Sequence, residues 1–268
     1  MKETFLKQGF AKLPSFIDSE EVARIGLIYD EILEDLESAS HLRSDLSGEG
    51  TVGVEKITQI MCPSSISTNL KKSKTYKQAL KQAQHLLGSD MALDFDMLIN
   101  KRPYTDTPTP LHQDAAYWIK MPDKRAVSCW IAIDPAIEEN GCMWFIPREK
   151  LEVVPHSAAI PGAALSCELS TEQAVCIPLK AGGATFHDGF TPHFSKGNTT
   201  EFHRRALILN FRPKAMIDLE RSMGIDHQGE RKVRNKSTLI ILNLKFELYL
   251  FIISILLSVE QSSIKKTS

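Results

Sequence analysis

The segment PTPLHQDAAYW, residues 108–118, places two metal-binding residue types two positions apart. His112 offers an imidazole nitrogen, and Asp114 offers a carboxylate oxygen. Because residues i and i+2 of a β-strand point to the same face, a strand here would aim both groups at one point. Two groups make only part of a metal site, so a further ligand has to come from another part of the chain.

Two histidines downstream, His187 and His193, lie in the segment GGATFHDGFTPHFSKGN. A single histidine is more often a structural or surface residue than a ligand. The neighbours favour His193, because Ser195 follows it by two positions and Arg204 by eleven. Arg204 heads the apolar segment RALILNF, where a guanidinium is costly unless a carboxylate pairs with it. That segment contains no acidic residue, so a bound dicarboxylate could be the partner.

Two imidazoles and one carboxylate around one ion form the facial triad of non-haem iron(II) oxygenases, which leaves coordination positions open. The same ligands would also suit a zinc-dependent hydrolase with a metal-bound water as nucleophile. Such a hydrolase needs a general base and gives Ser195 and Arg204 no role. An oxygenase that uses a 2-oxo acid as co-substrate gives both residues a role.

The elements that must position these side chains change along the chain. A helix is predicted over residues 20–38, capped by Asp18 or Ser19, and a second over residues 74–87, ending at Gly88. From about residue 91 the chain reads as short strands: ALDFDMLINK, AVSCWIAID, CMWFI, AVCIPL, ATFH and RALILNFR. Many short strands without alternating helices favour an antiparallel sandwich or barrel.

The sequence resembles the phytanoyl-CoA dioxygenase family of Fe(II)/2-oxoglutarate-dependent oxygenases over most of residues 5–217. The motifs that carry the resemblance are MLINK, LHQD, SCWIAID, ENGCMWFIP, and GGATFHDGFTPHFSKGN followed by Arg204. The resemblance implies a mainly β fold, a double-stranded β-helix or cupin-like jelly-roll barrel with flanking helices. We expect one domain over residues 1–218, with a helical part at 1–90 and a jelly-roll core at 91–217, followed by an atypical tail at 219–268.

The resemblance gives His112, Asp114 and His193 the role of Fe(2+) ligands and therefore of catalytic residues. It implies that 2-oxoglutarate and dioxygen are co-substrates and that a small organic substrate is hydroxylated. Related halogenating enzymes replace the carboxylate ligand by a small residue, so Asp114 favours hydroxylation. A non-catalytic jelly-roll binding module stays an alternative, against which the complete set of ligands speaks.

Five further residues match co-substrate positions of the family. Ser195 and Arg204 match the anchors of the distal 2-oxoglutarate carboxylate. Trp130 and Met97 match the pocket wall, although an apolar strand would also use both residues for core packing. Gln113 lies between the first two metal ligands.

One segment departs from the family. Relatives continue ENGCMWFIP with Gly-Ser-His, whereas this chain continues with Arg148, Glu149 and Lys150. That loop lies near the substrate in the family, so neither the substrate nor the use of a CoA thioester is predicted.

The composition is that of a soluble globular protein, with 43% hydrophobic residues, 24% charged residues and a formal net charge of -1. Such a charge gives no electrostatic reason to expect nucleic acid as a partner. The resemblance implies a small-molecule substrate as the partner. The five cysteines contain no C-x-x-C pair, and the N-terminus lacks the apolar core of a secretory signal. Both features indicate reduced thiols and a cytoplasmic protein.

The segment TLIILNLKFELYLFIISILLSV, residues 238–259, is apolar and long enough to span a bilayer, but Asn243, Lys245 and Glu247 interrupt it. Three interpretations stay open: a membrane anchor, a core or dimer-forming helix, and a non-native tail. Membrane contact is therefore expected only through this tail.

Overall fold

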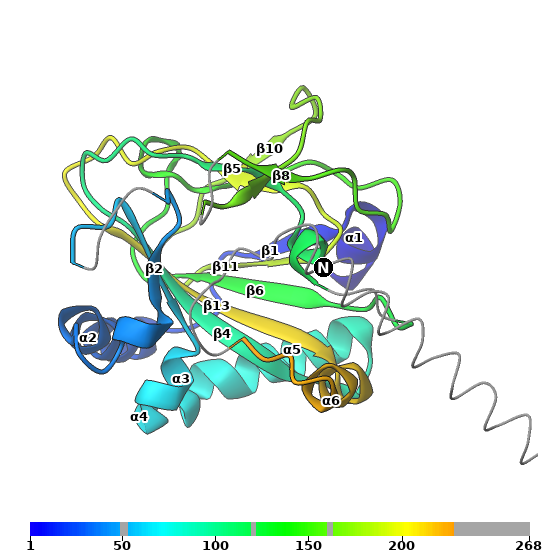
Figure 1. Cartoon of the computed structure of the whole chain (residues 1–268), viewed down its shortest axis with the longest axis horizontal. Coiled ribbons are helices and arrows are strands. Elements are labelled where there is room, and N and C mark those ends of the chain that lie inside the picture. Colours follow the sequence, from blue (N-terminus) through cyan, green and yellow to red (C-terminus); the bar gives the residue numbers. More distant parts are fainter. Residues whose placement is uncertain (49–52, 119–121, 160–162, 228–268) are drawn as a thin grey trace, which may run out of the picture.

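Residues 1–48, 53–118, 122–159 and 163–227 are described by the computed structural model of this chain. They form two antiparallel β-sheets that lie one above the other, with most of the helices beneath the larger sheet (Figure 1). The expected mainly β fold of jelly-roll type is confirmed. The apolar segment 238–259 lies outside the described residues.

The larger sheet has seven strands in the order β1 (Phe10–Leu13), β11 (Ala184–His187), β6 (Val127–Ala132), β13 (Arg204–Pro213), β4 (Met91–Lys101), β3 (Ile57–Met61) and β2 (Arg43–Asp45). The smaller sheet has four strands in the order β10 (Val175–Ile177), β7 (Met143–Phe145), β12 (His193–Ser195) and β5 (Thr109–His112). A separate ribbon pairs β8 (Ser157–Ala158) with β9 (Leu165–Ser166). The six strands predicted from the sequence are confirmed as β4, β6, β7, β10, β11 and β13.

The described helices are α1 (Lys2–Gln8), α2 (Ser19–Glu34), α3 (Pro63–Ile66), α4 (Thr68–Lys71), α5 (Lys74–Leu87) and α6 (Lys214–Ser222). Three short 3-10 helices are η1 (Ser40–Leu42), η2 (Asp114–Tyr117) and η3 (Glu138–Asn140). The two predicted helices are α2 and α5, and both are confirmed, although α2 ends at Glu34, four residues before the expected end. Asp18 caps α2 by accepting a hydrogen bond from the Glu21 N–H at 2.8 Å, and Gly88 ends α5 with a φ of 127°.

Strand β13 separates two hydrophobic cores because its side chains alternate between the two faces of the sheet. Leu207 and Leu209 point toward the helices and join a core that includes Ile25 of α2. Ile208 points toward the smaller sheet and packs in a second core with Phe145 of β7. The face that carries Ile208 is therefore the inner wall between the two sheets.

The N-terminal part is less helical than expected, because residues 1–90 supply β1, β2 and β3 to the larger sheet. These strands are short and pair with distant segments, as Phe10 does with His187. The expected boundary at 218 also falls inside α6. Glu220, which is fully buried, forms an ion pair with Arg212 of β13 and ties the residues beyond 218 to the domain.

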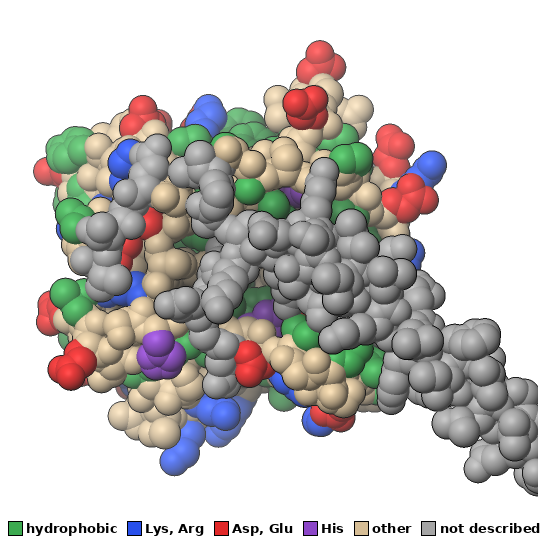
Figure 2. Space-filling model, viewed as in Figure 1, with side chains coloured by type: hydrophobic (Ala, Val, Ile, Leu, Met, Phe, Trp, Pro, Cys, Tyr) green, Lys and Arg blue, Asp and Glu red, His purple; other side chains and the backbone are tan. Residues whose placement is uncertain are grey.

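The distribution of charged side chains on the surface is consistent with the near-neutral net charge. On the face shown in Figure 2, acidic and basic side chains of the described residues are scattered along the edges and do not form one patch. No helix within the described part of the chain combines the length and hydrophobicity needed to cross a membrane.

We expect Glu220→Gln to lower the free energy of unfolding by about 3–5 kcal/mol, because it leaves the buried Arg212 without one of its partners. Lys214→Gln is the matched control in the same helix. Its exposed pair with Asp218 should be worth less than about 1 kcal/mol. Urea unfolding followed by circular dichroism measures both, and equal losses would show that residues beyond 218 are not anchored in this way.

Candidate metal centre

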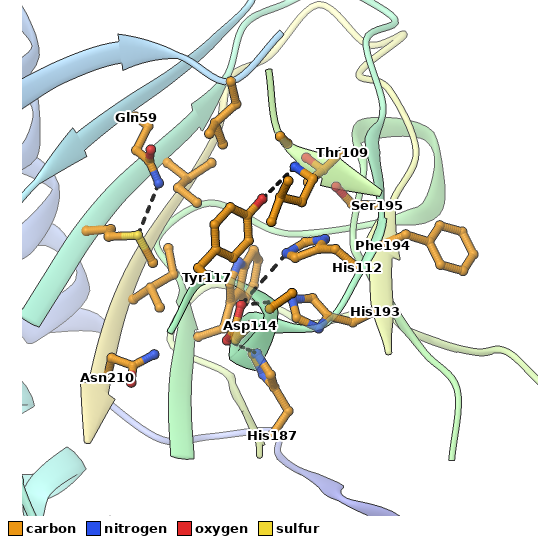
Figure 3. Close-up of a pocket in the computed structure, with 18 of the residues that line it drawn as sticks. Gln59, Thr109, His112, Asp114, Tyr117, His187, His193, Phe194, Ser195 and Asn210 are labelled. Atoms are coloured by element: carbon orange, nitrogen blue, oxygen red, sulfur yellow. Dashed lines mark hydrogen bonds and ion pairs between the residues drawn. The ribbon is translucent and has the colours of Figure 1, made fainter. Parts of the chain in front are cut away.

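His112 and His193 lie side by side in the smaller sheet, where they form a directly opposed pair across β5 and β12. The expected strand geometry of His112 and Asp114 is wrong in one respect. Strand β5 ends at His112, and Asp114 begins the 3-10 helix η2. The turn between them brings the Asp114 carboxylate in front of both imidazole rings (Figure 3).

The structure brings the three predicted ligands together. Nε2 of His112 lies 3.8 Å from Oδ1 of Asp114, and Nε2 of His193 lies 3.7 Å from the same oxygen. One ligand atom from each residue lies within 4.8 Å of the other two. This spacing suits a single ion at bond lengths of roughly 2 Å, and the donor set of two nitrogens and one oxygen matches the facial triad of non-haem iron.

Hydrogen bonds to backbone carbonyls fix the tautomer and the orientation of both imidazole rings. Nδ1 of His112 lies 2.8 Å from the Pro110 carbonyl oxygen, and Nδ1 of His193 lies 3.0 Å from the Thr191 carbonyl oxygen. A carbonyl oxygen only accepts, so each Nδ1 holds the proton and donates it. The lone pair on each Nε2 is then free to bind a metal, as in other histidine metal sites.

The electrostatic environment favours neutral imidazoles and an ionised carboxylate at this site. Burial lowers the pKa of His112 and, more strongly, that of His193, so both rings are neutral at neutral pH. Burial opposes ionisation of Asp114, but the imidazoles of His193, His187 and His112 outweigh it and hold the pKa of this carboxyl below its usual range. The site therefore offers two neutral nitrogens and one carboxylate.

His187, the competing candidate for the third ligand, lies behind the carboxylate. Its Nε2 is 3.3 Å from Oδ2 of Asp114, the oxygen that does not face the other two histidines. The cluster of possible ligand atoms contains His193 and does not contain His187. The choice of His193 over His187 agrees with this arrangement.

These side chains open into a pocket of about 500 Å³ between the sheets. Arg204 lines this pocket although its side chain is only 1% exposed. Its Nε and one terminal nitrogen have no hydrogen-bond partner among the described residues. Burial lowers the pKa of Arg204 to about 10, which still leaves the guanidinium charged at neutral pH. A buried cation with unsatisfied N–H groups fits a carboxylate ligand.

Three of the other predicted co-substrate residues also line the pocket: Trp130, Met97 and Ser195. The guanidinium of Arg204 lies 5.3 Å from the centre of the Trp130 ring, within the range of a cation–π contact. Ser195 is buried two positions beyond His193 on β12. The pocket thus joins the metal ligands and the proposed carboxylate anchors in one space.

The structure places Gln113 differently from the expectation. Its side-chain nitrogen donates to the carbonyl oxygens of Glu152 at 2.9 Å and Phe190 at 2.6 Å, and its oxygen accepts from the Val154 N–H at 2.9 Å. It is not among the residues that line the pocket. Gln113 fixes neighbouring loops, so we give it no co-substrate role.

The segment that departs from the family packs away from the pocket. Arg148 forms an ion pair with Asp188, and its N–H donates to the Gln8 carbonyl oxygen at 3.1 Å. None of Arg148, Glu149 and Lys150 lines the pocket. Arg148 therefore ties the loop to the end of α1.

Two polar residues near the metal ligands were missed by the sequence analysis. Ser128 and Asn210 lie within β6 and β13, which read as apolar strands, and both are buried. The available signal was parity, since Asn210 is six positions from Arg204 and so points to the same face of β13. A polar residue on the same strand face as Arg204, within an otherwise apolar strand, indicates a position near the site.

The sequence model described as Phytanoyl-CoA dioxygenase (PhyH) matches residues 5–206. The chain belongs to this family. Family members depend on Fe(II) and 2-oxoglutarate, and the donor set at His112, Asp114 and His193 fits that requirement.

Individual relatives share less of the chain. Phytanoyl-CoA dioxygenase domain-containing protein 1 of Rattus norvegicus is 32% identical over 122 residues, and this match spans 41% of each chain. Methylphosphonate hydroxylase of Gimesia maris is 25% identical over 223 residues, which cover 81% of this chain and 82% of the relative. The crystal structure of EvdO2 from Micromonospora carbonacea var. aurantiaca complexed with 2-oxoglutarate is 28% identical, with a TM-score of 0.62, over 78% of this chain and 88% of that one.

We expect His193→Ala to weaken Co(II) binding at this site at least about 100-fold, beyond the roughly 10–100-fold typical of outer contacts, because one of three ligands is lost. His203→Ala is the control, since this exposed imidazole bonds Asn100 at 3.0 Å outside the pocket and should leave the affinity unchanged. Titration with Co(II) followed by visible absorption measures both variants. Equal affinity of the His193 variant and the parent would contradict the ligand assignment.

Proposed function

We propose that this protein is an Fe(II)- and 2-oxoglutarate-dependent dioxygenase that hydroxylates a small organic substrate. The observation that supports this most strongly is the charged, buried Arg204, which lines the same pocket as the three metal ligands. Its Nε and one terminal nitrogen lack hydrogen-bond partners among the described residues. A zinc hydrolase on the same ligands would have no use for such a guanidinium. A non-catalytic binding module would have no use for the ligands.

In this proposal His112, Asp114 and His193 hold the iron. Arg204 and Ser195 bind the distal carboxylate of 2-oxoglutarate, the guanidinium by charge and the hydroxyl by hydrogen bonding. The chemistry that iron and 2-oxoglutarate supply when bound is oxygen activation coupled to oxidative decarboxylation.

The polypeptide contributes orientation and exclusion of water. The Pro110 and Thr191 carbonyls hold the two imidazoles in the tautomer that binds a metal. Burial of Arg204 removes water from the anchoring site, which strengthens its attraction for a carboxylate. Trp130 forms the wall beside this guanidinium.

The direction of β13 supports a position for the substrate. Arg204 lies at one end of the pocket-facing row of this strand, and Asn210 lies roughly 20 Å along it at about 3.3 Å per residue. Phe95 is the partner of Asn210 on β4, and the aromatic residues Tyr117 and Trp118 also line the pocket. We therefore place the substrate at this aromatic end, away from the 2-oxoglutarate anchor.

The lining of the pocket favours a substrate with an apolar body. Among the described lining residues, Arg204 is the single arginine and there is no lysine. The imidazole of His227 at the aromatic end is engaged by Asp94 and Glu220. A phosphonate or phosphate group would lack a free guanidinium or ammonium partner among these residues.

The reaction class is tested by reconstituting the full chain with Fe(II) without oxygen and titrating 2-oxoglutarate. A weak visible charge-transfer band is expected, and succinate release is expected after oxygen is admitted. Metal analysis of the purified protein accompanies this experiment. Zinc content with neither the band nor succinate would favour the hydrolase and overturn the proposal.

We expect Arg204→Ala to weaken 2-oxoglutarate binding by roughly 2–5 kcal/mol, because the carboxylate loses its buried charged partner. Arg204→Lys should recover only part of this loss, since an ammonium cannot form the two parallel hydrogen bonds of a guanidinium. Arg205→Ala is the matched control on the same strand, because Arg205 pairs with Asp134 and Asp30 on the opposite face. If Arg204→Ala and Arg205→Ala bound 2-oxoglutarate alike, the anchor assignment would be wrong.

In a panel of candidate substrates, compounds with an aliphatic or aromatic body should raise the rate of succinate release above the uncoupled rate. Methylphosphonate should not, because the aromatic end of the pocket offers no free cation among its described residues. Succinate assay and mass detection of an added oxygen atom decide the comparison. Hydroxylation of methylphosphonate with a lower KM than the apolar compounds would refute this substrate assignment.

A further inference from the structure

The two carboxylate oxygens of Asp114 have different surroundings. Oδ1 faces the metal site, at 3.8 Å from Nε2 of His112 and 3.7 Å from Nε2 of His193. Oδ2 faces away and accepts a hydrogen bond from the Ser128 hydroxyl at 2.7 Å, with Nε2 of His187 at 3.3 Å. One oxygen is therefore directed to the metal while the other is occupied by protein donors.

Ser128 is itself held by Asn210. The two residues are direct partners in the ladder between β6 and β13, and the Asn210 amide nitrogen donates to the Ser128 hydroxyl oxygen at 2.8 Å. A serine hydroxyl has one proton, and an ionised carboxylate can only accept. The serine proton must then go to Asp114, and the serine oxygen is left to accept from the amide. The chain of hydrogen bonds has a single consistent direction, from Asn210 through Ser128 to Asp114.

This chain of hydrogen bonds joins the two sheets at the metal site. His112 and His193 come from the smaller sheet, whereas Ser128 and Asn210 come from the larger one. Asp114 begins η2, outside both sheets, so its carboxylate would be free to rotate about its side-chain torsions without an external contact. Both Ser128 and Asn210 are at most 2% exposed, so water does not compete for these hydrogen bonds.

We propose that Asn210 and Ser128 are positioning residues that keep Asp114 a one-oxygen metal ligand. A carboxylate with two free oxygens can bind a metal through both and occupy two coordination positions. With Oδ2 held by Ser128, Asp114 occupies one position, and three stay open for the 2-oxo acid and dioxygen. The inference rests on the metal site of the proposed function and extends it to two residues that do not touch the metal.

The test uses Co(II) bound to the full chain, so its readout does not depend on turnover. Ser128→Ala should weaken Co(II) binding roughly 10–100-fold, as expected for loss of an outer contact to a ligand. It should also change the visible absorption of bound Co(II), which reports coordination number and geometry. Asn210→Leu, similar in size but without a donor, should shift the same spectrum in the same direction.

Because Asn210 acts through Ser128, the two effects should not add. In the Ser128→Ala background, Asn210→Leu should change Co(II) affinity less than about two-fold, as a double-mutant cycle would show. Ser128→Thr keeps the hydroxyl and should restore the parent spectrum. Thr185→Val is the control, because it removes a buried hydroxyl of the larger sheet that has no hydrogen-bond partner among the described residues.

Parent-like affinity and spectrum in Ser128→Ala, or effects of the two substitutions that add, would overturn the positioning role. Should Ser128→Ala fail to fold, the spectrum of Asn210→Leu decides the question alone. Co(II) binding that responds as expected, together with an absence of succinate release, would leave the positioning role in place and overturn the proposed function. Failure of the parent to bind Co(II) would overturn both.

Discussion

The site depends on the register between β5 and β12, which sets His112 directly opposite His193. Opposed residues of an antiparallel pair present their side chains to the same face at short range. A slip of one residue in either strand would turn one imidazole to the other side of the sheet. The remaining imidazole and Asp114 would then be too few ligands for the metal site. Both rings are then fixed by carbonyls two residues earlier in the chain, so each ring is positioned by its own local backbone.

The larger sheet provides a rigid support for this pair. Its outer face is covered by α2 and α5 through an apolar core, so the inner face can hold polar groups without losing the packing that stabilises the sheet. Strand β13 uses this division: Leu207 and Leu209 face the helices, while Arg204 and Asn210 face the pocket. Buried polar groups are costly unless paired, and most of those near the metal ligands are paired with one another. Arg204 is a charged group whose Nε and one terminal nitrogen lack partners among the described residues, which is why it indicates a ligand.

Family membership leaves the substrate open, because the relatives include a methylphosphonate hydroxylase and proteins known by their phytanoyl-CoA dioxygenase domain. In the proposed function the substrate lies toward Phe95 and Trp118, which line the pocket together with the metal ligands. The altered loop at Arg148 does not reach this lining and is fixed to Asp188. Under this proposal, Phe95 and Trp118 contribute more than that loop to the choice of substrate by this chain.

The sequence by itself determined the metal-binding residue types, the long helices and the strongly apolar strands, because these signals are local in composition and spacing. Tertiary structure decided that Asp114 reaches the site by a turn, that Gln113 faces other loops, and that short strands such as β1 join the larger sheet. It also brought Asn210 and Ser128, which are 82 positions apart in the sequence, into contact beside Asp114. Such contacts follow from the register of distant strands, and no local pattern of residues encodes that register.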